Sequence, residues 1–283
     1  MEYPELAKGL GVPKLFFKRE DMHPLGSHKG RSIPHMIDTY AAQGKKKFSI
    51  SSSGNAALAA ARYIREKNAG GAGLSLDIFI GERVPADKKS ELLSLADENI
   101  KVLEKERPLQ ALLETVKIGA RSLRQSTDDT ALIGYETLAE ELSHIPDHKA
   151  VFVATSSGTT AEAIGEYFLK NHISAEIHIV QTSSCHPMAA IFDTRPIVKE
   201  ISIANAIADK VAHRREKVMA IISQTKGFGW IVSNAEIKSA QEKLKSAGIS
   251  ATENGALSVA GLLRAVSEHR KFSGSVVCII GGK

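Results

Sequence analysis

A lysine near the start of a predicted helix is the first residue of this sequence that could do chemistry. Pro24 and Gly26 predict a turn, Ser27 is a candidate N-cap, and Lys29 follows in the first helical turn. The partial positive charge at a helix N-terminus disfavours a second cation, so it favours a neutral amine that can act as a nucleophile. The alternative is a solvated surface lysine without a role, because 37 lysines and arginines must lie somewhere.

Two loops rich in serine, threonine and glycine could bind anions. Residues 51–55 (SSSGN) and 155–160 (TSSGTT) each lie between a predicted strand and a predicted helix. The first N–H groups of a helix have no partner within it, and the helix dipole is positive there, so such loops bind phosphate or carboxylate. One such loop alone is most simply a helix cap. Two in one chain indicate a ligand with two anionic groups, and neither matches a nucleotide-binding pattern.

These segments need elements to position them, and the sequence alternates short apolar runs with longer amphipathic stretches. The apolar runs predict strands at residues 15–17, 48–51, 76–80, 101–103, 150–154, 176–181 and 276–280. The amphipathic stretches predict helices at residues 30–43, 56–67, 86–99, 108–123, 135–144, 159–171, 215–224, 234–247 and 256–269. This alternation predicts an α/β fold with parallel sheets, whose strands are covered on both faces.

Composition narrows the class of protein. Of the 283 residues, 43% are hydrophobic and 24% charged, which excludes disorder, collagen and a disulfide scaffold. Cys185 and Cys278 form no CxxC pair, so both are predicted to be buried thiols in a reduced compartment. No apolar run could span a bilayer and no signal-peptide pattern is present, so we expect a soluble, cytoplasmic protein without a membrane partner. No metal site is predicted.

The net charge of +5 hints at an anionic partner. Aromatic residues make up only 5% of the chain, and no predicted helix carries a continuous basic stripe with aromatic residues between the charges. Binding of nucleic acid needs both features, so it is not expected.

Taken in order, the motifs of this chain resemble those of the pyridoxal-phosphate enzymes of the tryptophan-synthase-β fold, also called fold type II. Members carry K-R-E-D, G-S-F-K-x-R, S-x-G-N, G-S-G-G-T, E-x-x-G-A and V-V-x-x-x-T/S/C-G. This chain has, in the same order, residues 18–21 (KRED), 26–31 (GSHKGR), 52–55 (SSGN), 156–160 (SSGTT), 253–256 (ENGA) and 276–282 (VVCIIGG). Residues 134–139 (GYETLA), 180–188 (VQTSSCHPM) and 202–207 (SIANAI) look most like segments of threonine synthases.

The resemblance implies a cofactor, pyridoxal 5'-phosphate, and a catalytic lysine. Lys29 would form a Schiff base with the cofactor and then move the α-proton of the substrate. Asn55 would hydrogen-bond the 3' oxygen of the cofactor. The substrate carboxylate would be held by a run of small polar residues: Ser52, Ser53, Gly54 and Asn55.

The resemblance also implies which residues surround the cofactor. Its phosphate would lie in the second loop, on Ser156, Ser157, Gly158, Thr159 and Thr160. Glu253 and Gly255 would line the ring, and Gly281 would lie at the pyridine nitrogen, where the family usually has a Thr, Ser or Cys side chain. The family usually has a second glycine where this chain has Thr159, and Phe where it has His28.

The implied fold is tryptophan synthase β-like, with two three-layer α/β domains and mainly parallel sheets. We expect a small domain over residues 21–138 and a large cofactor-binding domain over residues 1–20 and 139–283, with the site in the cleft between them. A homodimer is expected from the family. Relatives usually have several dozen residues before the K-R-E-D segment, and the end at Gly282 and Lys283 is abrupt, so we expect either a minimal member or a trimmed chain.

Three functions follow from these residues. The first is a threonine synthase-like enzyme that eliminates or replaces a group on a small amino acid. Threonine synthases hold the substrate phosphate with an arginine of an N-P-x-R segment, and the matching residues 127–132 have none, which favours a smaller substrate. The second is a serine or threonine ammonia-lyase. The third, suggested by Thr159 and Gly281, is an inactive relative that acts as a binding or regulatory protein.

Overall fold

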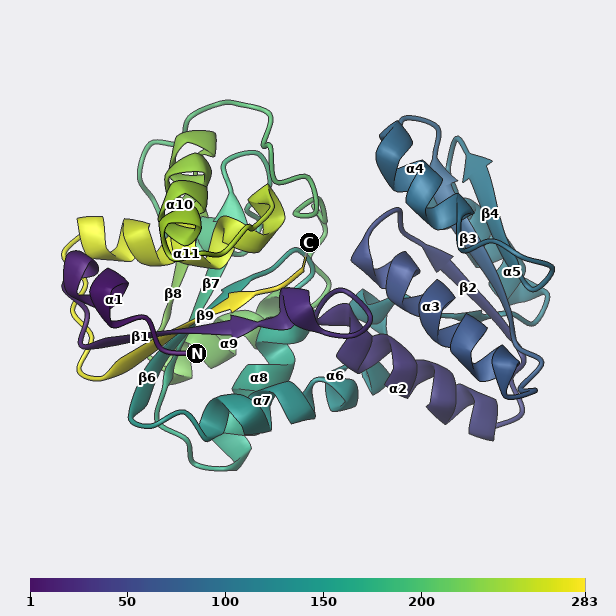
Figure 1. Cartoon of the computed structure of the whole chain (residues 1–283), viewed down its shortest axis with the longest axis horizontal. Helices are drawn as coiled ribbons and strands as arrows, with labels where there is room; N and C mark the ends of the chain where they lie inside the picture. The colour runs from purple at the N-terminus through teal and green to yellow at the C-terminus, as the bar shows by residue number, and fades with distance from the viewer. Residues whose placement is uncertain (283) are drawn as a thin grey trace. The chain divides into compact units, whose positions relative to one another are not determined.

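The computed structural model describes residues 1–282, which form two compact units. The large unit contains Met1–Met22 and the chain from Tyr135 onward, and the small unit is the continuous segment His23–Gly134. Figure 1 shows the elements of both units. The predicted α/β class with parallel sheets is confirmed, because every pair of neighbouring strands in the two sheets of the described chain is parallel.

A five-stranded parallel sheet forms the centre of the large unit. Its strands, in spatial order, are β1 (Lys14–Arg19), β9 (Ser275–Ile280), β6 (His148–Ala154), β7 (Glu176–Thr182) and β8 (Phe228–Val232). All six residues of β9 are buried, as expected for a strand between two others and covered on both faces. Because the strands are parallel, the loops that follow them all leave from the same edge of the sheet.

Helices cover both faces of this sheet. The helices are α1 (Pro4–Leu10), α7 (Glu136–Ser143), α8 (Thr159–Lys170), α9 (Arg215–Gln224), α10 (Asn234–Ser246) and α11 (Glu253–Ser267), with 3-10 turns η1 (Glu20–Met22) and η3 (Ala189–Ile191). Helix α11 crosses β9, β6, β7 and β8, and α10 packs against α11. Helices α8 and α9 pack together and contact β7, on the side opposite α11 in Figure 1.

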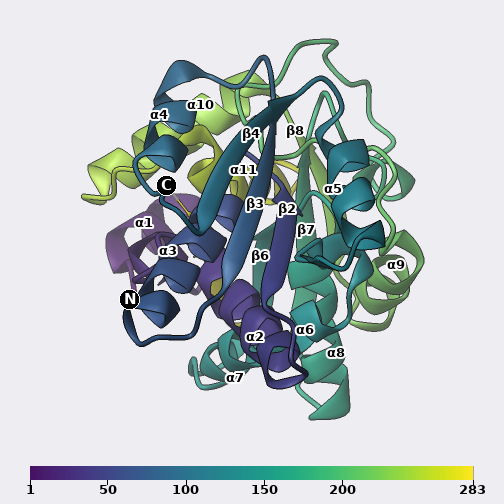
Figure 2. The ribbon, with the colours of Figure 1, turned by 90° about the vertical axis from the view of Figure 1, so that its right-hand side faces the viewer.

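The small unit is built on a four-stranded parallel sheet. Its strands, in spatial order, are β4 (Ile100–Lys105), β3 (Ser75–Gly81), β2 (Lys47–Ser51) and β5 (Arg121–Ser122). Its helices are α2 (Lys29–Ala42), α3 (Asn55–Ala69), α4 (Ala86–Leu93), α5 (Pro108–Lys117) and α6 (Thr130–Gly134), with the 3-10 turn η2 (Gln125–Thr127). After β4 the chain returns across the sheet to β5, which places α5 on the face opposite α3 (Figure 2).

Two predicted helices are shorter than the sequence suggested. The helix predicted to reach residue 99 ends at Leu93, because a turn follows in which the Asp97 carboxylate accepts the N–H groups of Asn99 (2.8 Å) and Ile100 (2.9 Å). The helix predicted to reach residue 123 ends at Lys117, since Gly119 has a φ of +104° and turns the chain into β5. The elements α1, α6, β5 and β8 were not predicted.

Three further properties bear on function. Cys185 and Cys278 are free and buried, as predicted. Among residues 1–282, no helix combines the length and the apolar character needed to cross a membrane. The same residues contain no group of three or more His, Cys, Asp or Glu side chains that could hold a metal ion.

Candidate active site

Lys29 is the first residue of α2 in the small unit, and its side chain is half-buried. The N-cap is His28 rather than the predicted Ser27. Ser27 is fully buried, and its Oγ accepts the backbone N–H of Lys29 at 3.3 Å. A Cβ on the next residue, Gly30, would lie 2.3 Å from the ring of His23, so glycine there lets the His23 turn pack against the helix start. The turn that precedes Lys29 is therefore tightly packed against the first turn of α2.

The first predicted anion loop, residues 52–55, connects β2 to α3 in the same unit. Helix α2 precedes β2 and runs back along the sheet, which brings the N-terminus of α2 to the edge from which this loop leaves. The Ser52 Oγ accepts the N–H of Gly54 at 3.3 Å, and Gly54 is the N-cap of α3. Glycine has no side chain to cap the helix, so the first N–H groups of α3 can serve a carboxylate. Asn55 begins α3 and is half-buried.

The second predicted anion loop connects β6 to α8 in the large unit. Gly158 is the N-cap of α8 in the left-handed conformation, with a φ of +94°, and its N–H donates to the Thr155 Oγ1 at 3.0 Å. Thr159 and Thr160 are buried in the first turn, and the hydroxyls of Ser157 and Thr159 lie 2.9 Å apart. The helix dipole, the first N–H groups and the hydroxyls together form a cradle for a phosphate group.

Other residues of the large unit fix this loop, and they were not among the predicted site residues. Gln181, at the end of β7, donates from its Nε2 to the Thr155 carbonyl at 3.3 Å, and its Oε1 accepts the N–H groups of Met188 and Ala189 at 3.0 and 2.9 Å. The Ser156 Oγ accepts the backbone N–H groups of Ala208 and Asp209 at 3.0 and 2.9 Å. The loop is thus bonded both to the end of β7, through Gln181, and to the backbone of residues 208 and 209.

The remaining predicted cofactor residues lie at the same edge of the large unit's sheet. Thr252 caps α11 by accepting the N–H of Gly255 at 3.3 Å, and Glu253 is the first helical residue. A Cβ at Gly255 would lie 2.9 Å from the Gly282 carbonyl oxygen, so the helix start and the end of β9 approach closely only because residue 255 is glycine. Gly281 directly follows β9, between the strand ends of β1 and β6.

The predicted site residues are therefore divided between the units. Lys29 and residues 52–55 belong to the small unit, and residues 156–160, Glu253, Gly255 and Gly281 belong to the large unit. Within each unit they gather at one edge of the sheet, where ligands of α/β proteins bind. Burial raises the pKa of the Cys185 and Cys278 thiols, which favours the protonated form of both.

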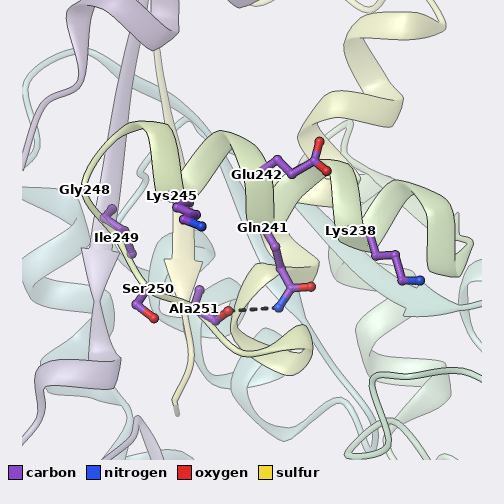
Figure 3. A pocket seen from close by; sticks show the side chains of 8 residues that line it. All are labelled: Lys238, Gln241, Glu242, Lys245, Gly248, Ile249, Ser250 and Ala251. Carbon is purple, nitrogen blue, oxygen red and sulfur yellow. Dashed lines mark hydrogen bonds between the residues drawn. The ribbon is translucent and has the colours of Figure 1, made fainter.

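Two hollows of the large unit contain none of the predicted residues. One, of about 580 Å³, lies along α10 and the following loop, and Figure 3 shows the Gln241 amide reaching the Ala251 carbonyl in it (3.0 Å). The other, of about 270 Å³, is lined in part by Arg195 and by Arg264, whose Nη1 lies 3.0 Å from the Glu236 carboxylate. The predicted site residues line neither hollow.

Comparisons with known proteins show the family of this chain. The sequence pattern of a family described as "Pyridoxal-phosphate dependent enzyme" matches residues 1–282. A threonine synthase of Synechocystis sp. is 26% identical over 291 residues, covering 99% of this chain and 74% of that protein.

The solved structures that resemble this chain show the same fold. Maize serine racemase superposes with a TM-score of 0.81 at 20% identity, covering 100% of this chain and 86% of that one. The processed form of threonine deaminase isoform 2 from Solanum lycopersicum gives a TM-score of 0.82 at 20% identity, covering 98% and 81%. The predicted tryptophan synthase β-like fold is thereby confirmed.

Proposed function

This chain belongs to the family of pyridoxal-phosphate-dependent enzymes, and we propose that it eliminates or replaces a group on a small amino acid, with Lys29 as the catalytic residue. The observation that carries the proposal is the pair of helix starts with glycine N-caps, at Gly54 and Gly158, in a chain that also places a lysine at the start of α2. These features supply one site for a carboxylate, one for a phosphate and one amine.

The residues present fit the cofactor. The cradle at α8 offers hydroxyl and N–H donors to a phosphate, and the glycines at residues 158 and 255 let these two helix starts pack closely against neighbouring parts of the large unit. When bound, pyridoxal phosphate supplies an electron sink for the bonds at the substrate's α-carbon. The chain's own residues would hold the phosphate (residues 156–160), the ring (Glu253, Gly255 and Gly281) and the cofactor's 3' oxygen (Asn55).

We assign the remaining steps to the small unit. The Lys29 amine would be the group that attaches the cofactor, and it would move the α-proton of the substrate. Ser52, Ser53, Gly54 and Asn55 orient the substrate by its carboxylate, through the N-terminal N–H groups of α3 and the serine hydroxyls. Orientation by this loop decides which bond of the α-carbon is broken.

A serine or threonine ammonia-lyase is the second candidate, and one observation favours a small substrate. Residues 127–132 contain no arginine to bind a substrate phosphate. In the structure Ala131 is fully buried, and its carbonyl accepts the Ser32 hydroxyl at 2.9 Å, so this stretch serves the packing of α6 on α2. L-Serine and L-threonine are therefore the first substrates to test. An inactive relative that only binds a partner is the outcome to exclude.

An absorbance spectrum of the full chain with pyridoxal phosphate tests the proposal. We expect a new visible band that shifts when L-serine or L-threonine is added, and release of a keto acid and ammonia if the enzyme is a lyase. Lys29→Ala should lose the band and the activity. Lys45→Ala, which changes an exposed lysine of the same unit, should keep both. No band in wild type, or no borohydride-trapped peptide containing Lys29, would overturn the proposal and favour the inactive relative.

The same proposal includes the domains, the oligomeric state and the compartment of the enzyme. We propose that the large domain, residues 1–20 and 139–283, binds the cofactor, and that residues 21–138 form the domain that carries Lys29. We also propose a cytoplasmic homodimer that works without nucleic acid. Light scattering of the purified chain at micromolar concentration tests the dimer, and a monomeric mass in the active protein would contradict it.

A further inference from the structure

A segment of irregular structure, residues 204–214, is bonded to the phosphate loop, and we call it the strap. Its Ala208 and Asp209 N–H groups donate to the Ser156 Oγ. Near its start, the Ala206 N–H donates to the Asn254 Oδ1 at 2.9 Å, so the strap is also tied to the start of α11. The backbone of the strap thus connects the two parts of the large unit to which we assign the cofactor.

The end of the strap packs directly on the phosphate loop. A Cβ placed on Gly158 would lie 3.3 Å from the Cβ of Arg214 and 2.9 Å from the Val218 Cγ2. Arg214 is the N-cap of α9, so the starts of α8 and α9 lie against each other in the large unit. Only a glycine at residue 158 leaves room for this arrangement.

Arg214 reaches a buried carboxylate in the phosphate helix. Glu162, in the first turn of α8, is fully buried, and its Oε2 lies 3.0 Å from the Arg214 Nη1. Arg214 itself is only 5% exposed. The Lys217 Nζ approaches the other oxygen, Oε1, at 3.0 Å from the solvent side. The same Nζ lies 3.5 Å from the Glu166 Oε1, so the cluster contains two carboxylates and two cations.

The charge of this cluster bears on an anionic ligand. An uncompensated Glu162 would repel a phosphate dianion at the start of α8, and it would be costly to bury. Arg214 and Lys217 together balance Glu162 and Glu166, and without Arg214 the cluster would carry one negative charge. The pair of Glu162 and Arg214 also fixes the strap, since Arg214 is its last residue.

We propose that Arg214, through Glu162, is a positioning residue that holds the strap on the phosphate loop and sets the charge of the phosphate site. The identity of the ligand, a phosphate monoester, rests on the proposed function. The contacts among Glu162, Arg214 and Gly158 do not depend on it. Glu162 and Arg214 were not among the site residues predicted from the sequence. They bond across 52 residues of chain.

The test compares four forms of the full chain, prepared free of cofactor: wild type, Arg214→Met, Glu162→Gln and the double variant. The probes are inorganic phosphate, pyridoxal phosphate and pyridoxal, which lacks the phosphate. Arg214→Met leaves the cluster with one negative charge, Glu162→Gln leaves it with one positive charge, and the double variant is neutral like the wild type. Arg264→Met is the matched control, because its Nη1 also lies 3.0 Å from a carboxylate, Glu236, in the same unit.

We expect phosphate and pyridoxal phosphate to bind roughly tenfold more weakly to Arg214→Met and at least as tightly to Glu162→Gln, with the double variant near wild type. Pyridoxal binding should change less than twofold in all forms, and Arg264→Met should bind all three probes as wild type does. If Arg214→Met does not fold, Arg214→Lys and the double variant decide, and both should keep phosphate affinity within threefold.

Other outcomes overturn the inference. Equal losses for pyridoxal and pyridoxal phosphate in Arg214→Met, or a double variant no better than the single one, would make the pair a structural ion pair only. A wild type that binds no inorganic phosphate also overturns it. A wild type that binds phosphate with the expected pattern, but forms no covalent adduct with pyridoxal phosphate, leaves this inference standing and refutes the proposed function instead.

Discussion

The two helix starts that we assign to anions are built alike but held differently. In the large unit, the loop before α8 is buried at Thr155, Thr159 and Thr160 and is bonded to Gln181 and to the strap. In the small unit, residues 51–55 are all half-buried, and the bond from Gly54 to Ser52 is local. The loop before α8 suits a ligand that stays bound, and the loop before α3 suits a substrate that must enter and leave.

Replacing the glycine N-cap in each loop should separate them most clearly. Gly158→Ala forces a side chain into a φ of +94° and 2.9 Å from Val218, which together cost about 2–4 kcal/mol of unfolding free energy. We expect pyridoxal phosphate affinity to fall by roughly a hundredfold, since about 1.4 kcal/mol is tenfold. Urea unfolding and a cofactor titration measure both effects.

The matched change in the other loop is Gly54→Ala. Its backbone is extended, with φ −121°, and nothing lies within 4 Å of a new Cβ, so stability should change by less than about 1 kcal/mol. Only the KM for the amino acid should rise. A large loss of cofactor affinity in Gly54→Ala, or none in Gly158→Ala, would show that the two loops do not differ in the way we describe.

Serine-to-alanine changes give a smaller contrast. Ser156→Ala leaves the N–H groups of Ala208 and Asp209 without their protein acceptor, at a cost of about 0.5–1.5 kcal/mol for each bond. It should weaken cofactor binding and loosen the strap, which hydrogen exchange at residues 206–210 would detect. Ser52→Ala removes one local acceptor, and we expect a change within about 1 kcal/mol that is confined to substrate binding. Equal effects on cofactor affinity would contradict the comparison.

The two units should also differ in their response to acid. His178 in the large unit is fully buried, stacked on Phe152, and its Nδ1 accepts the indole N–H of Trp230 at 3.2 Å. Burial lowers its pKa below the ordinary 6.5, despite the bond to Glu176. The neutral form of His178 therefore contributes fully to the stability of the folded protein above pH 6.5. This contribution is lost as the pH falls through the pKa that His178 has in the folded protein, which is lower than 6.5.

In the small unit the lowered pKa belongs to Asp128. Burial alone would raise it, but the Tyr40 hydroxyl, the Thr130 N–H and Arg121 stabilise the carboxylate and lower its pKa below 3.8. We expect the large unit to lose stability at a higher pH, seen in the emission of Trp230, the one tryptophan of the chain. His178→Phe should reduce this loss and His269→Gln, an exposed control, should not. Simultaneous acid unfolding of both units would contradict the expectation.

The sequence predicted what is local. Lys29, Gly54 and Gly158 lie in short segments whose turns and caps are set by neighbouring residues, and the structure has a helix start at each place. The strands at 48–51 and 150–154 were predicted because continuous apolar runs are typical of buried parallel strands. That the loops after them could bind anions was inferred from their Ser, Thr and Gly residues, and the ligand assigned to each loop came from the resemblance.

What the sequence did not predict depends on distant contacts. Strand β5 has two residues, and it is a strand only because Phe48 and Ser49 pair with it. Strand β8 contains Gly229, which a side chain could not replace, since a Cβ would lie 2.8 Å from the Ala189 Cα. Gln181 and Arg214 gain their roles from partners 26 and 52 residues away, and no spacing rule indicates such pairs.

The order of strands in the large sheet has a consequence for how the protein folds. Lys14 of β1 pairs with Ser275 of β9, and the whole small unit is synthesised between them. The small unit is continuous and can fold during synthesis. Strand β1 cannot join the large sheet until β9, which lies between β1 and β6, has been synthesised. Pairings so distant in sequence slow folding, so the nascent large unit exposes unpaired strand edges for longest and has the greater need of a chaperone.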